Sequence, residues 1–223
     1  MEKIAYLDLY GDVGSPKFVE AMGGDPANCI DVTVVDTFIR DNKDADVFKI
    51  KLRTRGGNVD DGYTIRENLI ASGKRIIIEV IGYVYSIGTV ILGAAKKEDT
   101  YITSDSEYLA HNPRFSDNTI GGDATDLQNY ANEMLKIENK IANTLALDSG
   151  IDLVDVKIIM KEAQPISGKE AVEKGLVGNL IDTTSIFPSH YFIDWGKITP
   201  ILKDTKGRYW FILPQTTTIK LVG

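Results

Sequence analysis

Ser86 lies at a corner of the sequence where a nucleophile could be held. It stands in "GYVYSIGTV" (residues 82–90), between the β-branched run "KRIIIEVI" and the small apolar run "ILGAA". A serine that precedes a helix often caps it, because its oxygen accepts a hydrogen bond from an otherwise unpaired backbone N–H. The same position suits a nucleophile, since the helix dipole and the free N–H groups favour negative charge there. This stretch alone is compatible with both readings of Ser86.

A serine nucleophile needs a base, and the chain has two histidines. His111, in "EYLAHNP", ends an apolar strand just before a proline, where a lone histidine is commonly structural. His190 lies in the tail, outside the apparent α/β core. If Ser86 is a nucleophile, His111 is therefore the histidine that could take its proton.

A glycine pair, Gly56 and Gly57, interrupts the chain in "TRGGNV" between an expected strand and an expected helix. Glycines at such a place let the backbone pass close to a packed neighbour or to a bound oxygen. The segment lacks the Gly-Lys-Ser/Thr of a phosphate loop and the third glycine of a dinucleotide loop. The nucleophile elbow of α/β-hydrolases also fits poorly, because Val84 occupies the position of its first glycine.

Composition indicates a soluble globular protein with one substantial core. The chain has 223 residues, 43% hydrophobic and 26% charged, which is ordinary for a folded domain. Its formal net charge is −7 and its pI about 4.9. An acidic chain is a poor partner for a phosphate backbone or an anionic membrane surface, so we expect neither nucleic acid nor membrane as a partner.

We expect no metal and no cofactor. The single cysteine, Cys29, cannot form an intrachain disulfide, and the histidines are too far apart in sequence to suggest a metal cluster. Asp60 and Asp61 fall in the first turn of an expected helix, where acidic residues are favoured anyway. The N-terminus lacks the pattern of a signal peptide, and no apolar stretch approaches the roughly 18 residues of a membrane span. The cytoplasm is the expected compartment.

Strands alternate with helices along the chain, which predicts an α/β fold. The tail differs, because "KITPILKDTKGRYWFIL" (197–213) is typical of two strands around a turn. We therefore expect a domain over residues 1–186 and a β-rich extension over 187–223 that contains a hairpin. The longest expected helix, 123–147, carries an apolar stripe of Leu127, Tyr130, Met134, Ile137, Ile141 and Leu145. The other expected strands are 3–11, 46–54, 74–84 and one or two within 100–112, and the other expected helices are 31–42, 59–73, 86–95, 153–161 and 167–175.

The order of these blocks resembles the proteolytic subunit of the Clp protease. A glycine pair after a strand is followed by "GYVYSIGTVILGAA", then "YLAHNP", then "ISGKEAVEKGLVGNLID", and the resemblance covers about 3–182. It is nearest to the phage and prophage branch, the head maturation proteases. The counterparts of that branch's motifs here are "LYGDVG", "YSIG", "HNP" and "EAVEKGLV".

The resemblance implies a fold, a site and an assembly. The fold would be the spiral of β-β-α units shared by Clp-type proteases and crotonases. Ser86 would be the nucleophile, His111 the base, and the backbone N–H groups of Gly57 and Ile87 the oxyanion hole. The enzyme would cleave peptide or protein substrates through an acyl-enzyme and would form a homo-oligomer of stacked rings, with the helix 123–147 joining subunits.

The sequence departs from the family pattern at the third catalytic residue. The family's acid stands four residues before the Ser/Thr that opens the last short helix, and counting back from Ser167 gives Ala163. Glu162 and Asp155 are the possible substitutes. Arg55 replaces the proline of the family's "SPGG". The chain also begins almost directly on its first strand, so loops that dock an unfoldase ring are not expected, and an ATPase partner is doubtful.

The sequence is compatible with three hypotheses for the function. The first is a serine endopeptidase, with phage head maturation preferred to general ATP-dependent proteolysis. The second is a catalytically weak or inactive relative that serves as an assembly or binding protein, which the alanine at 163 favours. The third is a crotonase-type acyl-CoA enzyme, which the pairing of Ser86 with His111 disfavours.

Overall fold

The computed structural model describes residues 2–115, 121–181, 200–203 and 209–211. The chain divides into two units, Met1–Ile181 and Asp182–Gly223. In the second unit β10 (Pro200–Lys203) pairs antiparallel with β11 (Tyr209–Phe211), within the segment where a hairpin is expected. The expected domain boundary at residues 186 and 187 lies outside the described residues. Among the helices described, none is both long and apolar enough to cross a membrane.

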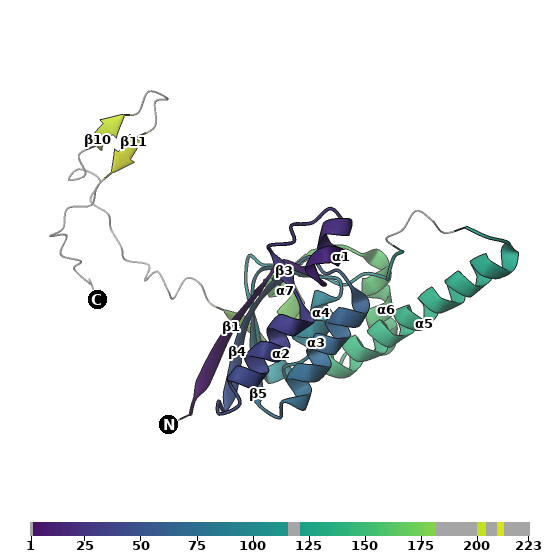
Figure 1. The fold of residues 1–223 in the computed structure, drawn as a ribbon, viewed down its shortest axis with the longest axis horizontal. Helices are drawn as coiled ribbons and strands as arrows, with labels where there is room; N and C mark the ends of the chain where they lie inside the picture. The colour runs from purple at the N-terminus through teal and green to yellow at the C-terminus, as the bar shows by residue number, and fades with distance from the viewer. Residues whose placement is uncertain (1, 116–120, 182–199, 204–208, 212–223) are drawn as a thin grey trace. The chain divides into compact units, whose positions relative to one another are not determined.

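The first unit is built on a mostly parallel seven-stranded sheet (Figure 1). Five strands lie in the order β1, β4, β5, β6, β9, and each is parallel to its neighbour. β7 runs parallel to the carboxyl end of β5, and β8 pairs antiparallel with β7. This arrangement confirms the predicted α/β class and is consistent with a Clp-type, crotonase-like fold. The bounds are β1 (Ile4–Tyr10), β4 (Val47–Thr54), β5 (Arg75–Tyr85), β6 (Thr100–Thr103), β7 (Glu107–Leu109), β8 (Ile166–Ser167) and β9 (Asn179–Ile181).

Helices pack on the sheet face to which the apolar side chains of β4 point. Phe48, Ile50 and Leu52 are fully buried, whereas the alternate residues Lys51 and Arg53 are exposed. This period-2 alternation is that of a strand with one face in the core. Figure 1 shows α2 and α3 lying side by side over this face. The helices and short elements are α1 (Pro16–Ala21), β2 (Asp12–Val13), β3 (Cys29–Ile30), α2 (Val32–Asp41), α3 (Val59–Ala71), α4 (Gly88–Leu92), η1 (Lys97–Asp99), α5 (Ala124–Ser149), α6 (Leu153–Glu162) and α7 (Gly168–Glu173).

The 26-residue helix α5 is buried only in its carboxyl half. Ile141 and Leu145 belong to the core, but Leu127 and Tyr130 have exposed fractions of 49% and 38%. In Figure 1 the amino-terminal half of α5 extends beyond the body of the first unit. The predicted apolar stripe is therefore a core contact over its second half and an uncovered surface over its first.

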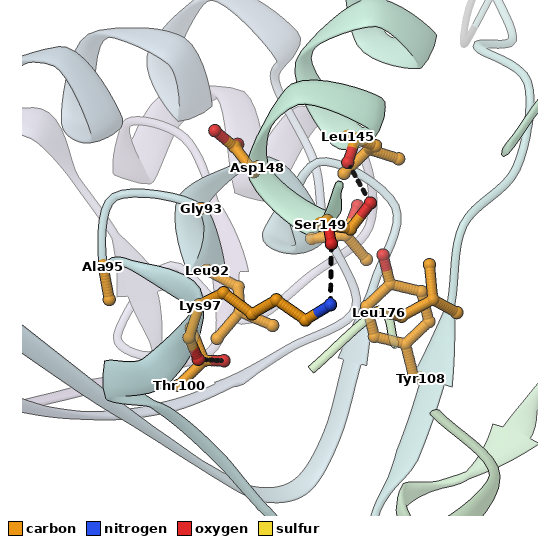
Figure 2. A pocket seen from close by; sticks show the side chains of 11 residues that line it. Leu92, Gly93, Ala95, Lys97, Thr100, Tyr108, Leu145, Asp148, Ser149 and Leu176 are labelled. Atoms are coloured by element: carbon orange, nitrogen blue, oxygen red, sulfur yellow. Dashed lines mark hydrogen bonds between the residues drawn. The ribbon is translucent and has the colours of Figure 1, made fainter. Parts of the chain in front are cut away.

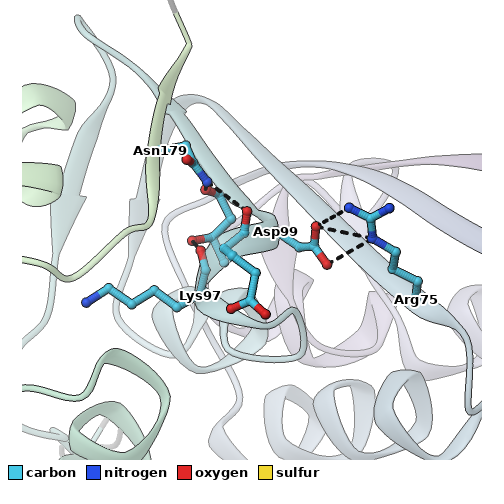
Figure 3. Close-up of polar contacts among 6 residues, drawn as sticks. Arg75, Lys97, Asp99 and Asn179 are labelled. Atoms are coloured by element: carbon cyan, nitrogen blue, oxygen red, sulfur yellow. Dashed lines mark hydrogen bonds and ion pairs between the residues drawn. The ribbon is translucent and has the colours of Figure 1, made fainter.

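Polar contacts around η1 tie three strands of the sheet together (Figure 3). The guanidinium of Arg75, at the start of β5, donates to both carboxylate oxygens of Asp99, with Nη2 to Oδ1 at 2.7 Å and Nε to Oδ2 at 3.1 Å. The amide of Asn179, at the start of β9, donates to the backbone oxygen of Glu98 at 2.8 Å. These bonds fix the amino ends of β5 and β9 on either side of β6, so that β5 enters the site region as part of a rigid sheet.

Candidate active site

Ser86 forms a strained corner between β5 and α4. Its φ is +56°, and within the described residues the other non-glycine residue with positive φ is Ala163. A non-glycine residue in this region costs on the order of 1–3 kcal/mol and persists only when its surroundings enforce it. The predicted helix over residues 86–95 is shorter than expected, since α4 spans Gly88–Leu92 and leaves Ser86 outside it. The side chain of Ser86 is thus displayed at a turn and does not belong to a helix.

Hydrogen bonds on both sides hold this corner. The N–H of Ser86 donates to the backbone oxygen of Leu109 at 2.8 Å, which extends the pairing of β5 with β7. The carbonyl oxygen of Ser86 accepts from the N–H of Thr89 at 3.0 Å and from the Thr89 hydroxyl at 2.6 Å. Thr89 is 3% exposed, so its hydroxyl bond is shielded from water. The backbone of Ser86 is therefore fixed, while its hydroxyl takes no part in the corner.

The side chain of Ser86 is not a helix cap. The N-cap residue of α4 is Ile87, and no side-chain hydrogen bond caps this helix. The capping reading of Ser86 is therefore wrong.

Tyr85 braces the same corner from the strand side. Its hydroxyl donates to the carboxylate of Glu107 on β7. Burial, together with that carboxylate, raises the pKa of Tyr85 to about 12. The tyrosine is thus a neutral donor near neutral pH and holds the end of β5 against β7.

Gly56 and Gly57 bring a second segment of backbone to Ser86. Both have positive φ, +96° and +148°. A Cβ on Gly56 would lie 2.5 Å from the Cβ of Ser86, and one on Gly57 would lie 2.1 Å from the carbonyl oxygen of Val13. Only glycine fits at either position, because a side chain would collide with a backbone or with the serine itself.

Two backbone N–H groups remain available at this junction. The backbone of Val13 forms hydrogen bonds with the residues before and after Gly57. Its N–H donates to the carbonyl oxygen of Gly56 at 2.8 Å, and its carbonyl oxygen accepts from the N–H of Asn58 at 2.8 Å. Within the described residues, no acceptor pairs with the N–H of Gly57 or with the N–H of Ile87. Paired N–H groups beside a serine can stabilise an oxyanion that forms on an attacked carbonyl.

His111 follows β7, and its Nδ1 lies 2.6 Å from the backbone oxygen of Asn112. A ring nitrogen facing a carbonyl oxygen carries a proton, so Nδ1 donates, and in the neutral form of the ring Nε2 is then the acceptor. The N–H of Asn112 in turn donates to the carbonyl oxygen of Met160 near the end of α6 at 3.2 Å. A neutral imidazole with a free Nε2 is the form that can accept a proton from a serine hydroxyl.

Ser86, His111, Gly57 and Ile87 line one pocket of about 160 Å³. They come from three segments separated by at least 24 positions, namely the β4–α3 loop, the β5–α4 corner and the residues after β7. The structure thus brings together all four residues that the sequence nominated. The remaining lining residues are Val59, Thr89, Ala110, Pro113, Arg114 and Ile141.

Ala163 ends α6 as its C-cap, with φ +50°, and its N–H donates to the carbonyl oxygen of Ile159. Glu162, the last residue of α6, and Asp155, in its first turn, are both exposed, and neither lines the pocket. The acceptor that the structure gives to the Nδ1 of His111 is therefore the carbonyl of Asn112, not one of these carboxylates.

Sequence reasoning missed Thr89 and Arg114. Thr89 stands three residues after Ser86, the spacing at which a hydroxyl can bond back to a preceding carbonyl, and this spacing could have indicated it. Thr89 also lines a small cavity of about 20 Å³ behind the corner, together with Tyr108 and Asp148 (Figure 2). Burial raises the pKa of Tyr108 far above its ordinary value, so the corner is backed by a neutral polar group. Arg114 directly follows "HNP", and apart from its charge nothing in the sequence indicated a role in the site.

The profile of the Clp protease family matches residues 34–184 of this chain. The chain belongs to the Clp protease family. The ATP-dependent Clp protease proteolytic subunit 2 of Treponema pallidum (strain Nichols) is 31% identical over 133 residues, which are 60% of this chain and 65% of that protein. The chain thus covers just under two thirds of that relative's length. The ATP-dependent Clp protease proteolytic subunit of Streptococcus suis (strain 98HAH33) is 26% identical over 185 residues, 80% of this chain and 91% of that protein.

Proposed function

We propose that this chain is a serine endopeptidase that cleaves peptide bonds through an acyl-enzyme. The observation that carries the proposal is the pocket itself, in which a strained serine, a histidine whose Nδ1 faces a backbone carbonyl and two unpaired backbone N–H groups meet. Each of these features, considered alone, also has a purely structural explanation. Together they supply the nucleophile, the base and the oxyanion donors that acyl transfer requires.

In the first half-reaction the Oγ of Ser86 attacks the scissile carbonyl carbon while Nε2 of His111 takes the hydroxyl proton. The N–H groups of Gly57 and Ile87 stabilise the negative oxygen of the tetrahedral intermediate. His111 then gives its proton to the leaving amine, and the C–N bond breaks. In the second half-reaction water replaces the amine, and the same residues release the acid and restore Ser86.

An assay with an unfolded protein substrate tests this proposal. We expect the wild type to produce new peptide amino groups, and Ser86→Ala and His111→Gln each to remove this activity. Thr33→Ser, a change at an exposed residue of α2 that does not line the pocket, serves as a control for differences between protein preparations. Equal release by the wild type and Ser86→Ala would contradict the proposal.

The second candidate is a catalytically weak or inactive Clp-like assembly or binding protein. The observation that favours it is Ala163, which leaves His111 facing a backbone carbonyl where the family pattern has an acid. The two candidates differ in one outcome of the same assay, because an inactive protein would release no peptides at any enzyme concentration while still assembling.

We also propose that the chain forms a homo-oligomer, most simply of stacked rings. The exposed apolar side chains on the amino-terminal half of α5, among them Leu127 and Leu135, support this. Phe115 packs edge-on against Tyr130 on the same half, with ring centroids 5.8 Å apart. Large apolar and aromatic side chains of this kind are typical of interface cores.

Light scattering at micromolar concentration tests the assembly. We expect a mass of several chains for the wild type and a lower mass for Leu135→Glu. Gln128→Glu, which adds the same charge at another exposed position of α5, should leave the mass unchanged. A monomeric wild type would refute the proposal.

For the biological role we propose head maturation of a phage or prophage in the bacterial cytoplasm, in preference to general ATP-dependent proteolysis. Its support is the resemblance of "LYGDVG", "YSIG", "HNP" and "EAVEKGLV" to that branch. Portal and capsid genes beside the gene of this protein would support the role. A gene for an unfoldase ATPase in their place would contradict it.

A further inference from the structure

The pocket that holds Ser86 carries one permanently charged side chain, the guanidinium of Arg114. Of its ten lining residues in the described part of the chain, none is an aspartate or a glutamate. None of the ion pairs formed among the described residues involves Arg114. A guanidinium cannot be deprotonated in a protein and presents paired donors that match a carboxylate. Among these ten lining residues, Arg114 therefore supplies the one permanent charge, and that charge is positive.

Four aliphatic side chains form an apolar part of the pocket wall beside the polar groups of the site. Ile87 is buried, Ile141 belongs to the core, and Val59 and Ala110 complete this part of the lining. The volume of about 160 Å³ is close to that of a cavity that holds one benzene molecule, roughly 150 Å³. It therefore accommodates a single side chain of a substrate beside the nucleophile.

We propose that Arg114 selects substrates with a glutamate at the residue whose carbonyl Ser86 attacks. Glutamate combines two methylene groups, which match the aliphatic part of the wall, with a terminal carboxylate, which matches the guanidinium. Aspartate has the charge with one methylene fewer, and glutamine has the length without the charge. This inference rests on the proposed endopeptidase function and adds a substrate class to it.

Two peptidyl diphenyl phosphonates that differ in one group test the inference. One carries the glutamate side chain at the reacting position and the other the glutamine side chain. The Oγ of Ser86 forms a bond to phosphorus, the bond from phosphorus to one phenoxide breaks, and the hydroxyl proton passes through His111 to that phenoxide. The readout is the rate at which the added mass appears on the peptide that contains Ser86, so slow turnover does not obscure it.

We expect the wild type to react about fivefold faster with the glutamate probe, which corresponds to the upper end for an ion pair open to solvent. In Arg114→Gln the two rates should become equal, and in Arg114→Glu the glutamine probe should react faster. Arg114 is exposed, so neither change should prevent folding. Arg55→Gln is the matched control, because Arg55 is also exposed and near Gly56 but stacks over the Tyr83 ring and does not line the pocket.

Each of the other outcomes would overturn a specific part of the proposal. Equal wild-type rates at Ser86 would overturn the selection of glutamate and leave the serine mechanism standing. A loss of preference in Arg55→Gln as large as in Arg114→Gln would also overturn it, since general electrostatic attraction would then explain the preference. Failure of both probes to modify Ser86 would overturn the proposed function and this inference together.

Discussion

Replacing Ala163 by aspartate should increase peptidase activity. The N–H of Asn112 bonds to the carbonyl oxygen of Met160, so the His111 segment lies against the last turn of α6, which Ala163 ends. Ala163 has φ +50°, a conformation that aspartate and asparagine tolerate better than alanine. The substitution therefore adds a carboxylate beside the turn of α6 that contacts the His111 segment, without a new backbone cost.

The size of the effect follows from what the acid of a triad does. Losing that acid costs a well-studied serine protease roughly 10⁴-fold in turnover, through the wrong tautomer and an unstabilised imidazolium. Here the carbonyl of Asn112, 2.6 Å from Nδ1, already fixes the tautomer. Stabilisation of the imidazolium charge is what a carboxylate would still add. A carboxylate within about 4–6 Å of an imidazolium stabilises it by roughly 1–3 pK units. We expect Ala163→Asp to raise turnover about 10- to 1,000-fold, since each pK unit corresponds to a factor of ten.

Turnover of a short fluorogenic peptide measures this effect. Ala163→Asn is the matched control, because it shares the backbone preference and nearly the shape of aspartate but lacks the charge. Glu162→Gln should leave turnover unchanged, since Glu162 is exposed and does not line the pocket. The reasoning fails if Asp and Asn at position 163 are equally active, or if Glu162→Gln lowers turnover more than tenfold.

Three further predictions concern the corner and the ion pair behind it. Ser86→Gly should be more stable than Ser86→Ala by about 0.5–1 kcal/mol in urea unfolding, because glycine relieves the positive φ; equal midpoints would argue against strain at this position. Thr89→Val should slow modification of Ser86 by fluorophosphonates at least several-fold while Thr89→Ser should not, because valine removes the hydroxyl bond to the Ser86 carbonyl and serine keeps it, whereas the N–H bond of residue 89 persists in both; equal rates for the two variants would remove the Thr89 hydroxyl from the account. Burial raises the pKa of Asp148 in spite of its ion pair with Arg66, so folding favours the protonated form and stability from this group should fall as pH rises above the ordinary aspartate value of about 3.9. Thermal unfolding across that range should show this slope in the wild type and lose it in Asp148→Asn.

The sequence predicted most of the elements because their signals are local. β4 alternates from Phe48 to its end at Thr54, and α3 begins with acidic residues after the Asn58 cap and ends just before Gly73. Ser167 and Glu170 at the start of α7 have the spacing of a capping box, but the box forms in one direction only. Ser167 accepts from the N–H of Glu170, whereas the Glu170 carboxylate lies 3.6 Å from the ammonium of Lys174.

The errors concern features that other parts of the chain determine. The helix after Ser86 was expected to reach Ala95, but α4 ends at Leu92. Gly93 packs so closely that an added Cβ would meet the carboxylate of Asp148, a contact with α5 that periodicity cannot reveal. The left-handed conformation of Ser86 is likewise enforced from outside, by Leu109 and Thr89.

The candidate site was predicted through resemblance, since no local pattern joins Gly57, Ser86 and His111 across the sequence. The residues that resemblance did not supply were found only in three dimensions. These are Thr89 behind the corner, the carbonyl of Asn112 on the histidine and Arg114 in the pocket.

The most direct test of the account is covalent modification by a fluorophosphonate, followed by intact mass and peptide mapping. The account predicts one adduct per chain, located on Ser86, because His111 can take the hydroxyl proton of that serine alone. Ser86→Ala should show no adduct, and His111→Gln should react far more slowly than the wild type. An adduct on another serine, or equal modification of the wild type and Ser86→Ala, would contradict the account.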